Sequence, residues 1–212
     1  MTMPADPLAQ ALRRAADVPM PGAREAAARV VTAAGRRGLV DLAYASVDSP
    51  VGKLLLVATR RGLVRVAFDL EPAEVVLADL AARVSPRIVE LPARFDTLRA
   101  ELDAYFSGQR RTFRTPVDWS LTTGFTHRVL RVTAGIPYGA VRTYAEVAGL
   151  AGSPRGARAA GNALHANPVP IVVPCHRVVR VGGVLGGYGG GPGRKELLLG
   201  LEGLTLGGVA PR

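Results

Sequence analysis

The most informative stretch of the sequence is PVPIVVPCHRVV, residues 168–179. Its first half is apolar and rich in β-branched residues, which is typical of a short buried strand that would deliver Cys175 into a loop. The thiolate is the nucleophilic form of cysteine, and a neighbouring base or positive charge activates it. His176 can supply the base, and Glu202 could hold its imidazole in one tautomer. The alternative is that Cys175 packs as a small buried apolar residue.

Cysteine usage and charge narrow the class of protein. Cys175 is the only cysteine among 212 residues, which excludes an intramolecular disulfide and a cysteine-based zinc site. A lone thiol suits a reducing compartment, so we predict a cytoplasmic protein. The net charge is +10, and residues 121–212 hold ten Lys and Arg against three Asp and Glu. This excess favours a nucleic-acid partner, although a solvated basic surface has the same composition.

Neither a membrane segment nor a metal site is expected. No run approaches the ~18 apolar residues that cross a bilayer, and no apolar segment follows a charged start as in a signal peptide. The three histidines are dispersed and show no metal-ligand spacing.

The first part of the chain reads as scaffold. Residues 1–40 form an N-terminal helical extension, and residues 41–120 form an α/β domain whose strands make an antiparallel meander. In its last helix, Leu98, Leu102 and Phe106 make one apolar stripe. The predicted elements are helices over 8–16 and 22–35, strands over 42–47, 53–59 and 63–68, and helices over 72–83 and 93–107.

The second part, residues 121–205 before a tail at 206–212, carries the chemistry. A first helix is predicted over 125–132. Thr143 and Glu146 have the spacing of a capping box, which predicts a helix over 144–151. Ser153 and Pro154 are typical of a helix start, as cap and first residue, and predict a helix over 154–164. Two helices joined by a short glycine-containing turn form a helix-turn-helix.

The second helix of this pair has an unusual surface for a DNA reader. It carries Arg155 and Arg158 among Gly and Ala, with few long polar side chains that could read base edges. Small residues allow close approach to a narrow surface, and arginine supplies charge for phosphates or for the space left by an extruded base. The alternative is that Gly and Ala only pack this helix tightly against its neighbour.

The motif Pro174-Cys175-His176-Arg177-Val178 resembles the active-site motif of the methylated-DNA–protein-cysteine methyltransferases, the O6-alkylguanine-DNA alkyltransferases. The similarity covers about residues 41–205. It implies an α+β fold, in which a small antiparallel sheet domain, ribonuclease-H-like, is followed by a mainly helical winged helix-turn-helix DNA-binding domain. Further matching stretches are Ser49–Gly52, Ile136–Gly139, Tyr144, Ala157–Ala159, Asn167-Pro168, Gly186–Gly191, Lys195-Glu196 and Leu201–Gly203.

The resemblance implies repair of DNA by direct reversal. The alkyl group of O6-alkylguanine, with O4-alkylthymine as a second candidate, would pass irreversibly and stoichiometrically to the cysteine after base flipping. The partner would be double-stranded DNA containing alkylated guanine. Neither a cofactor, a metal, nor an obligate protein partner is expected, and the protein would act as a monomer.

The family's functional residues carry over position by position. Cys175 would accept the alkyl group, and His176 would deprotonate it through a bridging water while Glu202 orients the imidazole. Asn167 would brace the turn that joins the recognition helix to the active-site strand, and Tyr144 would donate a hydrogen bond to the guanine as O6 leaves. The DNA-contacting residues would be Arg158, which fills the gap of the flipped base, with Arg155, Ala157, Gly161 and Tyr144. The alkylguanine pocket would comprise Val178, Tyr188, Gly189, Pro170 and Lys195.

Two departures from the family pattern bear on function. Some relatives carry a serine where this chain has Gly189, so the loop is expected to be more open. Relatives with a zinc domain that senses methylphosphotriesters need four further cysteines, so that activity is not expected here. Other classes stay open: a non-catalytic binder of alkylated DNA, a helix-turn-helix regulator with an incidental cysteine, and a thiol hydrolase.

Overall fold

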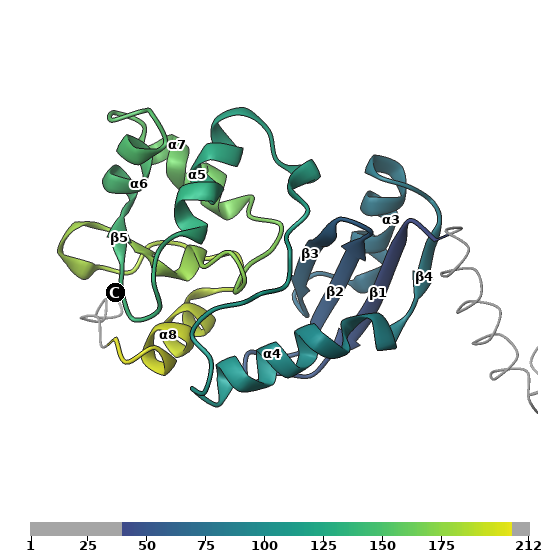
Figure 1. Ribbon diagram of the computed structural model, residues 1–212. Helices are drawn as coiled ribbons and strands as arrows, with labels where there is room; N and C mark the ends of the chain where they lie inside the picture. The colour runs from purple at the N-terminus through teal and green to yellow at the C-terminus, as the bar shows by residue number, and fades with distance from the viewer. Residues whose placement is uncertain (1–39, 205–212) are drawn as a thin grey trace, which may run out of the picture. The chain divides into compact units, whose positions relative to one another are not determined.

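The computed structural model describes residues 40–204, which belong to one compact unit (Figure 1). The helices predicted over 8–16 and 22–35 and the tail at 206–212 lie outside the described residues. The elements are β1 (Leu42–Val47), β2 (Leu54–Thr59), β3 (Gly62–Phe68), α3 (Ala73–Arg83), β4 (Ile88–Glu90), η1 (Pro92–Phe95), α4 (Asp96–Phe106), η2 (Trp119–Leu121), α5 (Gly124–Ala134), β5 (Arg142–Thr143), α6 (Tyr144–Leu150), α7 (Ala157–His165), η3 (Cys175–Arg177), β6 (Val178–Val179), η4 (Val181–Gly183) and α8 (Pro192–Leu201).

The sheet has the strand order β3-β2-β1-β4. Strands β1, β2 and β3 pair antiparallel, which confirms the predicted meander. The fourth strand was not predicted, and it pairs parallel to β1, so the sheet is mixed. Strand β4 has three residues, which is too short for a period-two pattern to show in the sequence.

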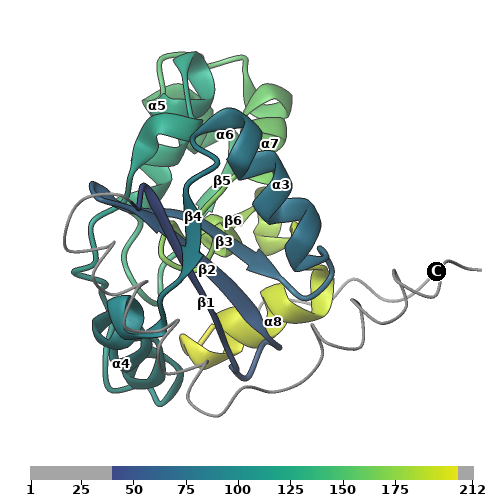
Figure 2. The same ribbon diagram turned by 90° about the vertical axis from the view of Figure 1, so that its right-hand side faces the viewer.

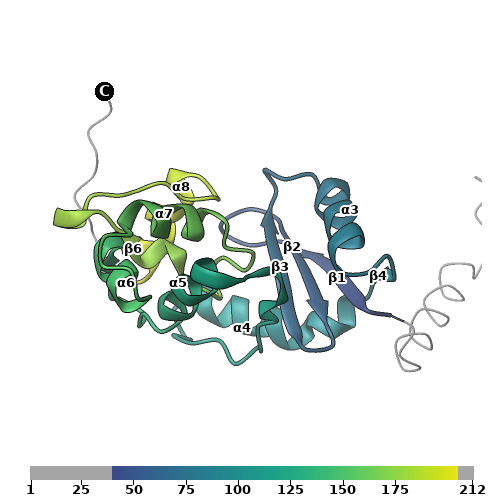
Figure 3. The same cartoon turned by 90° about the horizontal axis from the view of Figure 1, so that it is seen from above.

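The alternation of side chains along β2 explains why helices cover both faces of the sheet. Leu55 and Val57 pack with residues of α3, whereas Leu54 and Leu56 belong to the core that contains α4 and the helical half. Helices α3 and α4 accordingly lie on opposite faces (Figure 3). Each fully buried leucine contributes about 1.5–3 kcal/mol of transfer free energy, so these two faces hold the sheet in place.

Helix α4 turns a tyrosine into the core. Leu98 and Leu102 are buried as predicted, but the third member of the expected stripe, Phe106, is only half-buried. Tyr105 takes the inner position and is fully buried, because residues 98, 102 and 105 follow the i, i+4, i+7 spacing of one helix face.

The helical half consists of α5, α6, α7 and α8 around the cysteine (Figure 1). The capping box of α6 is confirmed, because Thr143 Oγ1 accepts from the Glu146 amide at 3.2 Å and Glu146 Oε2 accepts from the Thr143 amide at 2.6 Å. Helix α7 begins at Ala157, so the predicted start at Pro154 is wrong. Residues 153–156 instead close a backbone turn in which the Gly156 amide donates to the Ser153 carbonyl at 2.8 Å.

The predicted strand before the cysteine is also wrong. Residues 168–174 form a tight turn, with an isolated bridge between Pro170 and Val173 and a left-handed backbone at Ile171 (φ 73°). Proline lacks the amide hydrogen that a strand ladder needs, and positions 168, 170 and 174 are all proline. The strand in this region, β6, follows the cysteine and pairs parallel to β5.

Hydrogen bonds join the sheet to the helical half at this turn and at α8. The Val66 amide on β3 donates to the Pro168 carbonyl at 2.8 Å. Arg194 on α8 donates to the Val51 carbonyl at 2.5 Å and pairs with Asp69, which holds α8 near the β1–β2 turn (Figure 2). Among residues 40–204, no helix combines the length and the apolar character that crossing a bilayer requires.

Candidate active site

The cysteine lies at the start of the 3₁₀ turn η3 and is held by Asn167. Cys175 Sγ accepts a hydrogen bond from Asn167 Nδ2 at 3.1 Å. The same amide group donates to the Val173 carbonyl at 2.9 Å, and its oxygen accepts from the Val169 amide at 3.0 Å. Asn167 therefore ties both sides of the proline-rich turn together, in the position where the sequence predicted a brace.

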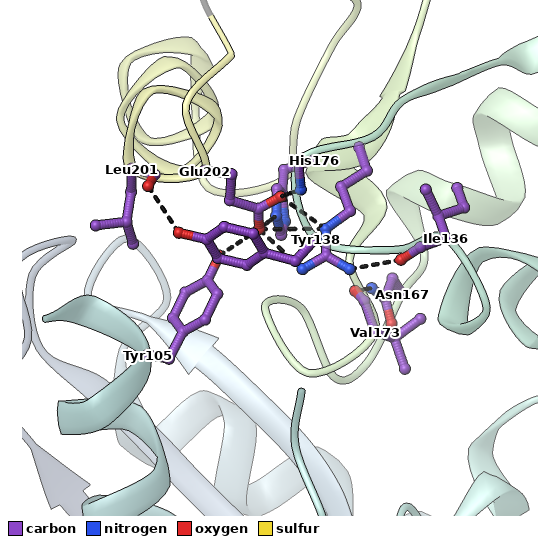
Figure 4. Close-up of polar contacts among 10 residues, drawn as sticks. Tyr105, Ile136, Tyr138, Asn167, Val173, His176, Leu201 and Glu202 are labelled. Atoms are coloured by element: carbon purple, nitrogen blue, oxygen red, sulfur yellow. Dashed lines mark hydrogen bonds and ion pairs between the residues drawn. The ribbon is translucent and has the colours of Figure 1, made fainter. Parts of the chain in front are cut away.

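His176 and Glu202 meet in the interior, as Figure 4 shows. Both side chains are fully buried, and His176 Nε2 lies 3.0 Å from Glu202 Oε1. A carboxylate only accepts hydrogen bonds, so Nε2 carries the hydrogen and Nδ1 is the basic nitrogen. Nδ1 is buried and has no hydrogen-bond partner within the described part of the chain. The imidazole is thus held in the tautomer that can accept a proton.

Glu202 receives further donors that sequence reasoning missed. Arg177 donates to both carboxylate oxygens, at 2.9 Å for Nε to Oε2 and 2.9 Å for Nη2 to Oε1. Tyr105 on α4 donates to Oε1 at 2.7 Å, and the Gly139 amide donates to Oε2 at 3.1 Å (Figure 4). We call these five residues, Tyr105, Gly139, His176, Arg177 and Glu202, the Glu202 network.

The network keeps Glu202 ionised. Burial alone would disfavour the charged form, but hydrogen bonds from His176 and Arg177 outweigh it and lower the pKa of the carboxyl group to about 2. Arg177 directly follows Cys175 and His176 in the motif, so its position in the sequence could have predicted it as part of the site. Tyr105 lies 97 residues from Glu202, and its only signal was a polar tip on an apolar helix face.

The reacting pair rests in its neutral form. Burial raises the pKa of the Cys175 thiol, although the hydrogen bond from Asn167 and the charge of Lys195 act in the opposite direction. Burial also lowers the pKa of His176, against the effect of Glu202. A neutral imidazole can accept the proton of a neighbouring protonated thiol once a substrate is bound for the thiolate to attack.

Tyr144 and Lys195 lie beside the glycine-rich loop. The Tyr144 hydroxyl is 3.5 Å from the Gly187 carbonyl, and a Cβ at Gly186 would lie 2.3 Å from the same hydroxyl, so glycine is required at 186. Lys195 is buried, donates to the Val178 carbonyl at 2.6 Å, and lies 5.9 Å from the centroid of the Tyr144 ring. Burial lowers the pKa of Lys195 to about 8.

A cavity of about 280 Å³ opens at the thiol. Of the five predicted pocket residues, Pro170, Tyr188 and Gly189 line it together with Cys175, whereas Val178 and Lys195 lie outside its lining. A Cβ at Gly189 would meet only the His165 carbonyl, at 3.8 Å, so this position is open. Strand β3 and the turn after it contribute a wall that was not predicted, consisting of Arg65, Val66, Phe68 and Glu71.

Of the predicted DNA-contacting residues, Tyr144 begins α6 and the other four lie on α7 and the turn before it. Arg155 and Arg158 are exposed, and within residues 40–204 neither guanidinium forms an ion pair. Gly161 faces Tyr144, with 3.7 Å between the ring and the position of a Cβ, so α7 packs closely on that residue. Ala157 is half-buried. We call Arg155, Ala157, Arg158 and Gly161 the α7 surface.

Comparison with known proteins gives the same picture for both halves. Residues 42–119 match the family model for the ribonuclease-like domain of 6-O-methylguanine DNA methyltransferase. Residues 124–204 match the model for the DNA-binding domain of the same family. The α+β fold class and the ribonuclease-like first half expected from the sequence are thereby confirmed.

Named relatives and solved structures agree. The methylated-DNA–protein-cysteine methyltransferase of Mycobacterium tuberculosis is 39% identical over 159 residues, 75% of this chain and 91% of that protein. The one of Rattus norvegicus is 35% identical over 187 residues, 82% of this chain and 88% of that protein. A crystal structure of the M. tuberculosis O6-methylguanine methyltransferase matches with a TM-score of 0.67 and 37% identity over 76% of this chain and 92% of that one. A structure of the M. tuberculosis protein in complex with DNA matches with a TM-score of 0.67 and 36% identity, covering 76% and 93%. This chain therefore belongs to the 6-O-methylguanine DNA methyltransferase family.

Proposed function

We propose that this chain repairs DNA by moving the alkyl group from O6 of an alkylated guanine onto Cys175. The observation that carries the proposal is the two buried contacts Asn167–Cys175 and His176–Glu202, of which Asn167 and Cys175 line a cavity of about 280 Å³. The cavity gives a small alkyl adduct access to the sulfur. A neutral base, His176, is the next residue in the sequence. The names of the family's members supply the substrate class.

The transfer is a single displacement at carbon. His176 Nδ1 takes the thiol proton through a water, and the sulfur attacks the alkyl carbon. The S–C bond forms as the C–O6 bond breaks, and the electron pair of that bond stays on the guanine. A hydrogen bond from Tyr144 supports the leaving base, which finally gains the proton that the thiol lost. The thioether is stable, so each molecule reacts once.

The same proposal requires the base to leave the duplex. An alkyl group on O6 sits in the base-pair edge, where a protein sulfur cannot reach it inside a stacked helix. In this proposal α6 and α7 act as the helix-turn-helix, with α7 lying against the duplex. Arg158 fills the gap of the flipped nucleotide, and Arg155 contacts phosphate. Turning out the base costs a few kcal/mol, and less for a base that already pairs badly.

We also infer a monomer that acts in the cytoplasm. All the residues of the Glu202 network and the cavity come from one chain, so the chemistry needs no second copy. A free thiol keeps its nucleophilic form best in a reducing compartment.

Intact-protein mass spectrometry tests the proposal directly. The protein is mixed with excess duplex that contains one O6-methylguanine. We expect a mass gain of one methyl group, located on the peptide that holds Cys175 and saturating at one per protein. The Cys175→Ala variant should bind the same duplex and gain nothing. An unchanged mass of the wild-type protein, with binding retained, would contradict transfer and leave a damage-binding or regulatory protein.

A further inference from the structure

Tyr105 is the side chain that links the sheet half to the Glu202 network. It lies on α4, is fully buried, and donates its hydroxyl hydrogen to Glu202 Oε1 at 2.7 Å. His176 Nε2 contacts the same oxygen at 3.0 Å (Figure 4). Arg177 Nη2 also donates to Oε1, at 2.9 Å. Three residues therefore share one oxygen, and the one from α4 is not part of the cysteine motif.

The sharing has an electrostatic consequence. A hydrogen bond to a carboxylate draws on the negative charge that would otherwise stabilise a neighbouring cation. The cation at issue is the imidazolium that forms when His176 takes the thiol proton. Every donor to Glu202 Oε1 other than His176 thus weakens the tendency of His176 to be protonated before substrate arrives.

Among the groups around His176, Glu202 Oε1 is the main source of negative charge. Burial and the two nearby cations all favour the neutral imidazole, while Glu202 alone favours the charged one. The titratable and charged groups that face the pair are Arg177 beside it, Lys195 on α8, Cys175 in the same turn, Tyr188 with its ring centroid at 6.4 Å, Tyr105 on α4, and Tyr138, whose ring stacks 5.9 Å from the Arg177 guanidinium.

We propose that Tyr105 is a positioning residue that sets the basicity of His176 through their shared oxygen on Glu202. The role in alkyl transfer rests on the proposed function, but the effect on His176 does not. By occupying Oε1, the hydroxyl keeps His176 neutral and able to accept a proton. The sheet half thereby takes part in the chemistry as well as in the scaffold.

The hydroxyl is suited to this role, and the ring is held independently of it. Burial and the charge of Glu202 raise the pKa of Tyr105, so the hydroxyl remains a donor throughout the working pH range. The ring packs against Phe106 and Phe113 with centroids 5.3 and 5.2 Å apart. The Tyr105→Phe variant therefore keeps the packing and removes only the hydrogen bond.

The first test titrates His176 by nitrogen-15 NMR. The chain has three histidines, so His176→Gln assigns the signal. In Tyr105→Phe, only His176 and Arg177 donate to Oε1. We expect the pKa of His176 to rise by about half a unit to one unit, which corresponds to a fraction of the free energy of one charge-assisted hydrogen bond. The matched control is Tyr138→Phe, which loses a hydroxyl bonded to the Leu201 carbonyl at 2.8 Å and keeps every hydrogen bond to Glu202. Its His176 should titrate as in the wild type.

The second test is the pH dependence of single-turnover methyl transfer. The acid limb of Tyr105→Phe should move to higher pH by the same amount, with the plateau rate within about twofold of wild type. A purely structural role would lower the rate without moving the limb. If Tyr105→Phe fails to fold, 3-fluorotyrosine at position 105 replaces it. The fluorinated phenol is a stronger donor, so the pKa of His176 should fall.

The outcomes separate the two proposals. An unmoved His176 titration in Tyr105→Phe, or a shift to lower pKa, would overturn the role of Tyr105 whether or not the protein transfers alkyl groups. A wild-type protein that transfers nothing would instead remove the proposed function and leave the titration result standing.

Discussion

The Glu202 network, apart from Tyr105 on α4, lies in the same helical half as the α7 surface, and the two regions are built in opposite ways. In the network, one buried carboxylate accepts from Tyr105, Gly139, His176 and Arg177. On the α7 surface, Arg155 and Arg158 are exposed, and within residues 40–204 neither forms an ion pair. In one region a buried carboxylate has all its hydrogen-bond donors inside the protein, and in the other the charges are exposed to solvent.

In the proposed function, this difference separates chemistry from recognition. Proton transfer needs groups held in one geometry in a low dielectric, where each hydrogen bond is strong and each lost partner is costly. Binding a polyanion needs exposed charges whose effects are individually modest and screened by salt. Substitutions should therefore affect stability and chemistry in the network, but affinity alone on the α7 surface.

The largest effect should come from Glu202→Gln. Glutamine leaves the buried Arg177 guanidinium without its counter-charge, so we expect the free energy of unfolding to fall by about 3–5 kcal/mol. Loss of the His176 partner should slow transfer by about 100-fold or more. Urea denaturation and single-turnover kinetics measure the two effects. The control is Glu196→Gln, an exposed position on the same helix; equal stability of both variants would contradict the network's importance.

Acid should act through the same carboxyl group. The pKa of Glu202 is lowered to about 2 in the folded protein from 4.5, so its contribution is fully present above pH 4.5 and is lost as the pH falls toward 2. A difference of this size corresponds to about 3 kcal/mol, with little solvent screening because the side chain is buried. Denaturation midpoints measured between pH 5 and 2 should fall more steeply for wild type than for Glu202→Gln. Parallel curves would show that Glu202 is not held ionised.

A smaller and different effect is expected from Arg158→Ala. The free energy of unfolding should stay within about 0.5 kcal/mol of wild type, because the side chain is exposed. Affinity for duplex DNA should fall about tenfold. Arg155→Ala should reduce the slope of log affinity against log salt concentration by about the amount of one phosphate contact. Fluorescence anisotropy across a salt series measures both. Arg99→Ala on α4 is the control with an exposed arginine elsewhere, and an equal loss of affinity there would show that the α7 surface is not the binding face.

Gly189→Ser should have the smallest effect and lies at the edge of both regions. Its backbone is not in the left-handed region, and a Cβ there meets only the His165 carbonyl, at 3.8 Å, so the fold should not change. The added side chain narrows the cavity, so transfer from O6-benzylguanine should slow by a few-fold relative to O6-methylguanine, less than about tenfold. Competition between the two substrates, read by mass, measures the ratio. An unchanged ratio would show that bulky groups do not extend toward Gly189.

Structural features that depend on residues close together in the sequence could be predicted. The three-stranded meander follows from three short apolar runs separated by turn residues, and the start of α6 follows from Thr143 and Glu146 three residues apart. The pairing of Cys175 with His176 follows from adjacency. Where local pattern competed with backbone chemistry, prediction failed. The apolar run at 169–173 looked like a strand, but prolines around it remove the amide hydrogens that a strand needs.

The sequence by itself determined the family and most of the regular elements of residues 41–205, and it predicted Cys175 as the nucleophile and His176 as its base, because each rests on residues close together in the chain. Only the tertiary structure decided which groups share Glu202, how Tyr105 enters the site, and that the sheet lines the cavity at the thiol. These contacts join positions up to 97 residues apart. Periodicity and motif spacing describe one segment at a time, whereas such contacts arise from the packing of two faces of the fold against each other.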